Sequence, residues 1–357
     1  MRHLWFLAAL CWATANAATD GSVNDQASVA ETIFSDDYQT LTPLAIEITG
    51  PLKALTRDKA PEPQARPGTL TMTASGAHFS IGLKPRGKSR RKRSNCRFPP
   101  LWLEFNKKDI KGTLFAGHHR RKLVTQCVAL SASNRDPSKI WLEMLAYRSL
   151  NLLTEHSLRV QPVLITWRDS AAPEKTYQHA GFILEHKKEL AQRAGLTIRK
   201  VDKVRRATLD PAHANLGALF NLMIGNPDFS LSSGPAKGDC CHNSIPMQDA
   251  AGAFHPVIYD FDNTGLVNPR YATTPDNLNL GSVRQRLYRG YCRHNEQIAS
   301  GIAQLLAQRS AIESLFSAHP GVSKAEKKRV AKFLNAFFTR YTSARDQQRR
   351  LGRQCLG

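Results

Sequence analysis

Three aspartates and an asparagine in the second half of the sequence have the types and spacing of a metal site. Asp228 follows an apolar segment that predicts a helix, and Asn243 comes fifteen residues later. The apolar run 256–259 then leads into Asp260 and Asp262. Carboxylates at the end of a buried strand are unfavourable unless a cation pairs with them. Oxygen ligands are what hard divalent cations prefer, so the pattern predicts a site for Mg²⁺ or Mn²⁺.

Simpler interpretations of these acids remain open. Asp260 and Asp262 could form a turn at the end of a strand, closed by the residues that follow. Asp228 could be a turn or helix-cap aspartate after a proline.

A dense run of cations precedes these acids. Residues 84–93 contain seven Lys or Arg side chains and no acid. Within the run, Arg86, Gly87, Lys88 and Ser89 could form a phosphate cradle, since glycine lets backbone amides approach and the cations supply charge. A solvated loop explains the run equally well. It is not a P-loop, because the pattern GxxxxGK[ST] is absent from the sequence.

Composition narrows the function classes. The 357 residues are 41% hydrophobic, which is too apolar for a disordered chain and enough for a sizeable core. With 50 Lys and Arg against 29 Asp and Glu, the formal net charge is +21, which favours anionic partners.

No HExxH or GxSxG motif supports a metalloprotease or an α/β-hydrolase, and the histidines form no recognisable pattern.

The first residues predict export. A positive start, the apolar run 4–13 and the small residues at 15–17 are typical of a secretory signal peptide over residues 1–17. The protein is therefore expected in the periplasm or secreted, with a flexible segment over 18–40. The apolar run is too short to span a bilayer, and no later stretch approaches the necessary length.

Six cysteines remain after removal of the signal peptide, and an even number in an exported chain favours disulfides. Sequence alone leaves the pairing open. Proximity along the chain favours Cys96 with Cys127 and Cys292 with Cys355. In the adjacent pair 240–241, at least one cysteine is expected to be free or bonded elsewhere.

The periodicity of apolar residues predicts an α+β protein of two lobes that meet near residue 186. The N-terminal lobe, 41–186, is a mainly antiparallel sheet with one helix, and the C-terminal lobe, 187–357, is mainly helical. Strands are expected at 44–48, 70–73, 79–83, 101–105, 120–126, 159–167 and 180–185, and helices at 139–155, 188–206, 211–224, 294–316 and 323–348.

The order of these motifs resembles the protein-kinase-like superfamily, and within it the CotH-type, spore-coat kinase-like branch. The resemblance lies in Asn226-x-Asp228, Asn243 and the run 259–262, and in 86–89, which is similar to the RGxS element of that branch. The resemblance covers residues 40–290, and only a few positions in this range match a motif. The runs IGNPDFS and YDFDNTGLVNPRYA are also similar to uncharacterised exported bacterial proteins.

The resemblance implies roles for the acids. Asp228 would accept the hydroxyl proton of the acceptor substrate. Asn243 and Asp260 would hold magnesium across the phosphates of a nucleotide such as ATP, and Asp262 would be a second ligand or a structural carboxylate.

It also implies roles in the N-terminal half. A lysine on the strand before the helix 139–155 would bind phosphate, for which Lys122 fits best and Lys108 is the alternative. Glu143 on that helix would pair with this lysine. Backbone near Glu185, where the chain passes between the lobes, would receive the adenine.

Three functions follow as hypotheses. The first is a secreted kinase-like phosphotransferase that moves a phosphoryl group from a nucleotide to an unknown hydroxyl acceptor. The second is a catalytically inactive kinase-fold module that binds an anionic envelope component through residues 84–93 and 120–122. A nucleic-acid binder ranks last, because residues 84–94 contain no aromatic side chain for stacking.

Overall fold

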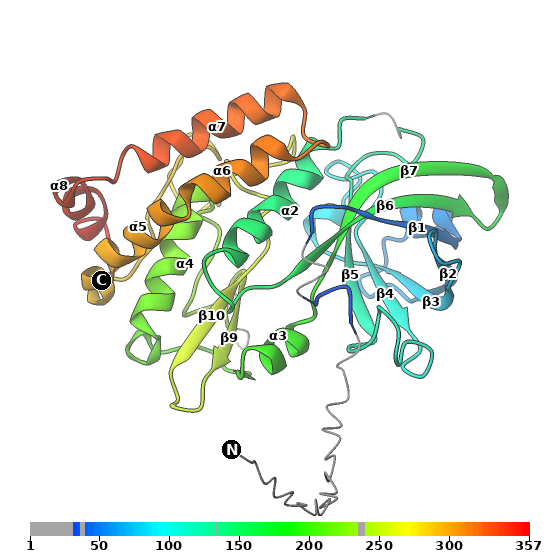
Figure 1. Cartoon of the computed structure of the whole chain (residues 1–357), viewed down its shortest axis with the longest axis horizontal. Helices are drawn as coiled ribbons and strands as arrows, with labels where there is room; N and C mark the ends of the chain where they lie inside the picture. Colours follow the sequence, from blue (N-terminus) through cyan, green and yellow to red (C-terminus); the bar gives the residue numbers. More distant parts are fainter. Residues whose placement is uncertain (1–30, 36–39, 133–134, 235–239) are drawn as a thin grey trace, which may run out of the picture.

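The computed structural model describes residues 31–35, 40–132, 135–234 and 240–357. The predicted signal peptide and most of the segment 18–40 lie outside these ranges. In Figure 1, a barrel of strands lies on the right and most of the C-terminal helices lie on the left, with α2 between them.

Within the described residues, seven strands form a closed barrel in the order β1-β2-β3-β4-β5-β7-β6. Neighbouring strands are antiparallel except β1 and β6, which pair in parallel from Leu44 opposite Val163 to Gly50 opposite Asp169 and so close the barrel. The strands are β1 Leu44–Gly50, β2 Arg66–Met72, β3 His78–Pro85, β4 Leu101–Phe105, β5 Arg120–Thr125, β6 Val160–Asp169 and β7 Ala172–Leu184.

The predicted two-lobed, protein-kinase-like fold with a mainly antiparallel N-terminal sheet is wrong. The strands lie near their predicted positions, but they form a closed mixed barrel, followed by a small sheet and the C-terminal helices. The alternation of apolar residues shows which segments are extended and which face is buried, but not which distant strand each one pairs with. The parallel pairing of β1 with β6 is such a long-range choice.

The barrel encloses its own apolar core. Along β1, the side chains of Ile46 and Ile48 are fully buried and alternate with outward residues. The ring of Trp167 on β6 lies 4.9 Å from that of Phe98 in an edge-on contact. A second apolar cluster includes α2 and the C-terminal helices.

The remaining elements are helices and a small sheet, whose strand order is β10-β9-β8 in the described residues. The predicted helix 211–224 is confirmed as α4, whereas 188–206 ends early at Arg193 and 294–316 divides at Gln308. The bounds are α1 Leu52–Arg57, α2 Ser138–Asn151, α3 Lys187–Arg193, β8 Thr197–Ile198, α4 Pro211–Ile224, β9 Ser244–Gln248, β10 Phe254–Ile258, α5 Ile298–Ala307, α6 Arg309–Ala318, α7 Lys324–Phe338 and α8 Ala344–Gln347.

Three disulfides form among the described residues. Cys96 bonds to Cys127 and Cys292 to Cys355, the two pairs that proximity along the chain favours. Cys240 and Cys241 bond to each other, contrary to the expectation for 240–241. Such bonds are typical of an oxidising, extracytoplasmic compartment. In the described part of the chain, no helix has the length and apolar character needed to cross a membrane.

The Cys292–Cys355 disulfide closes a loop of sequence separation 63, so we expect its removal to destabilise the protein. The double variant Cys292→Ala/Cys355→Ala should lose about 4 kcal/mol of unfolding free energy, because the unfolded chain gains entropy. The matched control is Cys240→Ala/Cys241→Ala, whose bond joins neighbouring residues and should contribute much less. Urea unfolding of both variants measures the difference, and equal losses would contradict the expectation.

Candidate functional site

Ten of the residues predicted for the site line a single pocket. Its walls come from the segment after β3, from β5 and α2, and from the segments that follow α4 and β10. Residues far apart in the sequence therefore meet at one surface. The predicted residues that line it are Arg86, Gly87, Lys88, Ser89, Lys122, Glu143, Asp228, Asn243, Asp260 and Asp262.

The end of α4 positions Asp228. Gly225 ends the helix with a φ of 67°, a left-handed conformation that glycine adopts without strain. The buried side chain of Asn226 then accepts a hydrogen bond from the backbone N–H of Asp228 at 3.1 Å and donates to Asn221 Oδ1 at 3.0 Å. Asn226 thus connects the helix to the loop that carries Asp228.

The β9–β10 hairpin brings Asn243 and Asp260 together. Ser244 at the start of β9 lies opposite Ile258 at the end of β10, and the N–H of Tyr259 donates to the carbonyl of Asn243 at 3.0 Å. Both Asn243 and Asp260 have positive φ values, 49° and 68°. Left-handed backbone at non-glycine residues is uncommon and is enriched at functional sites.

Asp228 forms a hydrogen-bonded pair with His242. Asp228 Oδ1 lies 2.7 Å from His242 Nε2, and this bond raises the pKa of His242 above its ordinary value. Asn243 Nδ2 donates to the backbone carbonyl of Asp228 at 2.7 Å, which directs the amide nitrogen toward Asp228 and leaves Oδ1 as the free acceptor. His242 was not predicted as a site residue, and its place beside Asn243 was the available signal.

Asp260 is exposed to the pocket, and its backbone N–H donates to the hydroxyl oxygen of Tyr147 at 2.9 Å. Protein around the carboxyl displaces water, and this loss of solvation together with the charge of Asp262 raises the pKa of Asp260 above its ordinary value. Arg90 and Arg86 oppose the shift. Tyr147 lies four residues after Glu143 on α2, on the same helix face.

The predicted pairing of Glu143 with Lys122 is wrong, because Arg90 is the partner of Glu143. Arg90 Nη2 donates to Glu143 Oε1 at 2.8 Å, and Arg90 Nε donates to Asp262 Oδ2 at 2.8 Å. Tyr271 also donates to Asp262 Oδ2, at 3.0 Å. Burial disfavours the charge of Arg90, but Asp262 and Glu143 outweigh it and hold the pKa of Arg90 above its ordinary value.

Asp262 is therefore held by an ion pair, which supports the structural alternative for this carboxylate over a role as metal ligand. Arg90 lies in a short 3₁₀ segment, Ser89–Arg91, inside the cationic run. The sequence did not single out Arg90, because the run contains seven cations in ten positions and nothing in it indicates which of them is buried.

Lys122 lies on β5 and reaches the pocket between two aromatic rings. Its ammonium is 5.6 Å from the ring centroid of Trp102 and 5.1 Å from that of Tyr259, within cation–π range. Burial and the nearby charge of Arg86 lower the pKa of Lys122 to about 8. Arg86 also lies over the Trp102 ring, at 5.5 Å, so two cations approach the pocket together.

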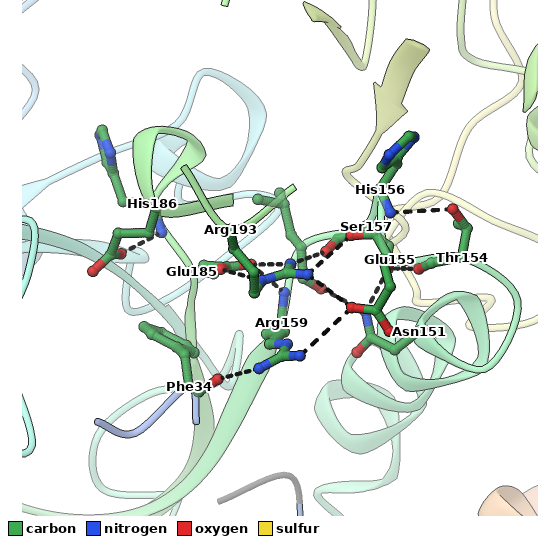
Figure 2. A network of polar contacts seen from close by, with 12 residues as sticks. Phe34, Asn151, Thr154, Glu155, His156, Ser157, Arg159, Glu185, His186 and Arg193 are labelled. Carbon is green, nitrogen blue, oxygen red and sulfur yellow. Dashed lines mark hydrogen bonds and ion pairs between the residues drawn. The ribbon is translucent and has the colours of Figure 1, made fainter. Parts of the chain in front are cut away.

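Neither Lys108 nor Glu185 itself lines this pocket. Lys108 is exposed in the turn after β4 and is not among the lining residues. The backbone N–H of Glu185 donates to the carbonyl of Arg159 at 2.9 Å, and its carboxylate binds Arg193, in the separate network of Figure 2. Leu184 is the residue of this segment that lines the pocket.

Comparison with protein-family models finds no match for this chain, and comparison with curated proteins finds none either.

We expect Arg90→Met to lower the unfolding free energy by about 3–5 kcal/mol, because it leaves Glu143 and Asp262 buried without a cation. Unpaired buried carboxylates favour the protonated form, so the loss should shrink as the pH falls. Arg168→Met is the control, since Arg168 pairs with Glu47 at the surface and should contribute much less to stability. Urea unfolding at neutral and mildly acidic pH tests this. Equal stability of the two variants would contradict it.

Proposed function

We propose that this pocket binds the phosphates of a nucleotide with a divalent cation and transfers a phosphoryl group to a hydroxyl acceptor. The observation that carries the proposal is that Asp228, Asn243 and Asp260 line the same pocket as Arg86 and Lys122. Phosphoryl transfer depends mainly on positioning and on charge stabilisation, and it needs both carboxylates and cations at one place.

The donor atoms fit a hard divalent cation. The Asp260 carboxylate and Asn243 Oδ1 are oxygen donors at adjacent ends of one hairpin, which suits Mg²⁺ or Mn²⁺ with water and phosphate oxygens as the remaining ligands. Because Asp262 is held by Arg90 and Tyr271, we assign one such ion to the site. When bound, the ion would neutralise negative charge on the phosphates.

The chain's own side chains supply the other functions. Arg86 and Lys122 bind and orient phosphate oxygens through charge-assisted hydrogen bonds. Asp228 accepts the proton of the acceptor hydroxyl, while the acceptor oxygen forms a bond to phosphorus and the bond to the nucleotide's leaving oxygen breaks. The 2.7 Å hydrogen bond from His242 orients the Asp228 carboxylate for this role.

The proposal includes the cellular compartment in which the protein acts. The three disulfides of the described residues, together with the predicted signal peptide, support an enzyme that acts in the periplasm or after secretion. The phosphoryl donor in that compartment is the first ligand to identify, and ATP is the first nucleotide to test.

A second candidate function is anion binding without transfer, for example of an anionic envelope component. The observation that favours it is that two of the pocket's aspartates are already engaged, Asp228 with His242 and Asp262 with Arg90. In this case the cations would bind the ligand, and binding would weaken steeply with salt.

Thermal unfolding with ATP and Mg²⁺ tests the proposal. At one hundred times its dissociation constant a ligand should add about 2.7 kcal/mol of stability. Asp260→Asn should lose the magnesium-dependent part of this gain, and Asp228→Asn should keep binding but lose phosphoryl transfer to any acceptor found. Asp109→Asn, the same change at an exposed aspartate, should behave as the wild type.

Two results would contradict the metal-dependent site. One is a magnesium-dependent shift that persists unchanged in Asp260→Asn. The other is the absence of any stabilisation of the wild type by a nucleotide with magnesium. Stabilisation by phosphate polyanions that is independent of Asp260 and lost at high salt would favour the anion-binding function.

Phosphate affinity should depend on pH through Lys122. Its ammonium is charged below its pKa of about 8 and neutral above it, so binding should weaken as the pH rises through that value, by roughly tenfold. Lys122→Arg keeps its charge throughout, and its affinity should stay nearly constant from about pH 7 to about pH 9. Calorimetric titration of both proteins measures this. A parallel decline in both would exclude Lys122 as the cause.

A further inference from the structure

Three histidines meet at a place separate from this pocket. His156 lies in the turn after α2, His213 in the first turn of α4, and His255 on β10. One ring nitrogen from each lies within 4.8 Å of those of the other two. The ring centroids are 4.8 Å apart for His156 and His255, 5.2 Å for His156 and His213, and 5.6 Å for His213 and His255.

Hydrogen bonds assign the tautomers of two of these rings. His213 Nε2 lies 3.1 Å from the carbonyl oxygen of Pro256, and His255 Nε2 lies 2.9 Å from Asp249 Oδ2. A carbonyl and a carboxylate oxygen accept, so both Nε2 atoms carry the hydrogen and both Nδ1 atoms keep a free lone pair. This arrangement, with the second nitrogen bonded to an acceptor, is typical of metal-binding histidines.

His255 Nδ1 is a buried nitrogen that has no hydrogen-bond partner in the described part of the chain. The side chain as a whole is 12% exposed. A buried acceptor without a partner is unfavourable, and such atoms are uncommon in folded proteins. A cation at the centre of the three rings would satisfy it.

The turn that carries His156 is held in place by its neighbours, as Figure 2 shows. The Glu155 carboxylate binds Arg193 at 3.0 Å and Arg159 at 3.5 Å, and the Ser157 carbonyl accepts from Arg193 at 2.9 Å. The ring of His156 points away from these side chains in Figure 2. The network therefore fixes the backbone of the turn and leaves the imidazole available to the cluster.

The charge state of the rings also suits a metal. Burial, with the neighbouring histidines, lowers the pKa of His213 to about 4. Burial and His255 also lower the pKa of His156. Neutral imidazole is the form that binds metal. Asp249, bonded to His255, and Asp210, which accepts from the N–H of His213 at 2.7 Å, supply negative charge nearby.

We propose that His156, His213 and His255 bind one divalent transition-metal ion of the zinc class, at a site distinct from the phosphate pocket. Imidazole nitrogens select zinc, copper or nickel over magnesium and calcium. Tetrahedral zinc with nitrogen ligands at about 2.0–2.1 Å places those nitrogens about 3.3 Å apart. The three ring nitrogens lie within 4.8 Å of one another, so they need to approach by at most about 1.5 Å. The fourth position is left to water or an anion, since the three rings are partly exposed.

Metal titration of the mature, chelator-treated protein tests the proposal. We expect one equivalent of Zn²⁺ to bind, and one equivalent of Co²⁺ to give the visible absorption of a low-symmetry site with nitrogen ligands. His255→Ala and His156→Ala should abolish both, whereas His78→Ala, at an exposed histidine on β3, should leave both unchanged. Asp249→Asn should weaken zinc binding by about 10–100-fold without changing the stoichiometry.

A footprint on the wild type keeps the test independent of the folding of any variant. Histidines are modified with diethylpyrocarbonate, with and without Zn²⁺, and mapped by mass spectrometry. Protection of His156 and His255 supports the site. Protection confined to His118 and His186, whose rings stack 3.3 Å apart on the barrel side, would overturn it. Failure of the wild type to bind stoichiometric zinc would overturn it equally.

Discussion

The candidate site depends on one buried guanidinium. Arg90 is 8% exposed and bonds to Glu143 on α2 and to Asp262 after β10, so it connects the segment after β3 to two other parts of the chain. Two carboxylates could not be buried so close together without a cation between them, because their desolvation and mutual repulsion would be uncompensated. Asp260 lies two residues before Asp262, and this ion pair therefore also constrains where Asp260 lies.

A short hairpin connects both candidate sites. At one end of the β9–β10 pair, Asn243 and Asp260 enter the candidate pocket, because the antiparallel register places Ser244 opposite Ile258. Toward the other end, His255 on β10 reaches the histidine cluster through a ring whose orientation depends on Asp249. The two sites use different ligand atoms, oxygen in the pocket and nitrogen in the cluster, so different metal ions would be preferred at each.

The pocket contains both acidic and basic side chains, although the chain as a whole is strongly basic. The chain carries a formal charge of +21, yet the pocket holds acids and cations that modify one another. Burial and the charge of Arg86 lower the pKa of Lys122, while burial and the charge of Asp262 raise that of Asp260. A pocket of this kind favours a ligand that itself carries both charges, such as a phosphate group with its cation.

The amino-acid sequence was sufficient for local features and for part of the pocket's lining. The extended segments and the helix 211–224 could be predicted because apolar periodicity and turn chemistry are local properties of the chain, and proximity along the chain favoured two of the disulfide pairs. Ten of the residues that line the pocket were also predicted, several of them through the family resemblance. Tertiary structure alone decided that β1 pairs with β6 to close the barrel and that Arg90, not Lys122, binds Glu143. It also brought His156, His213 and His255 together from three elements. These outcomes depend on contacts between distant segments, and such contacts are selected by packing and by the energetic need to pair buried charges, which no local pattern encodes.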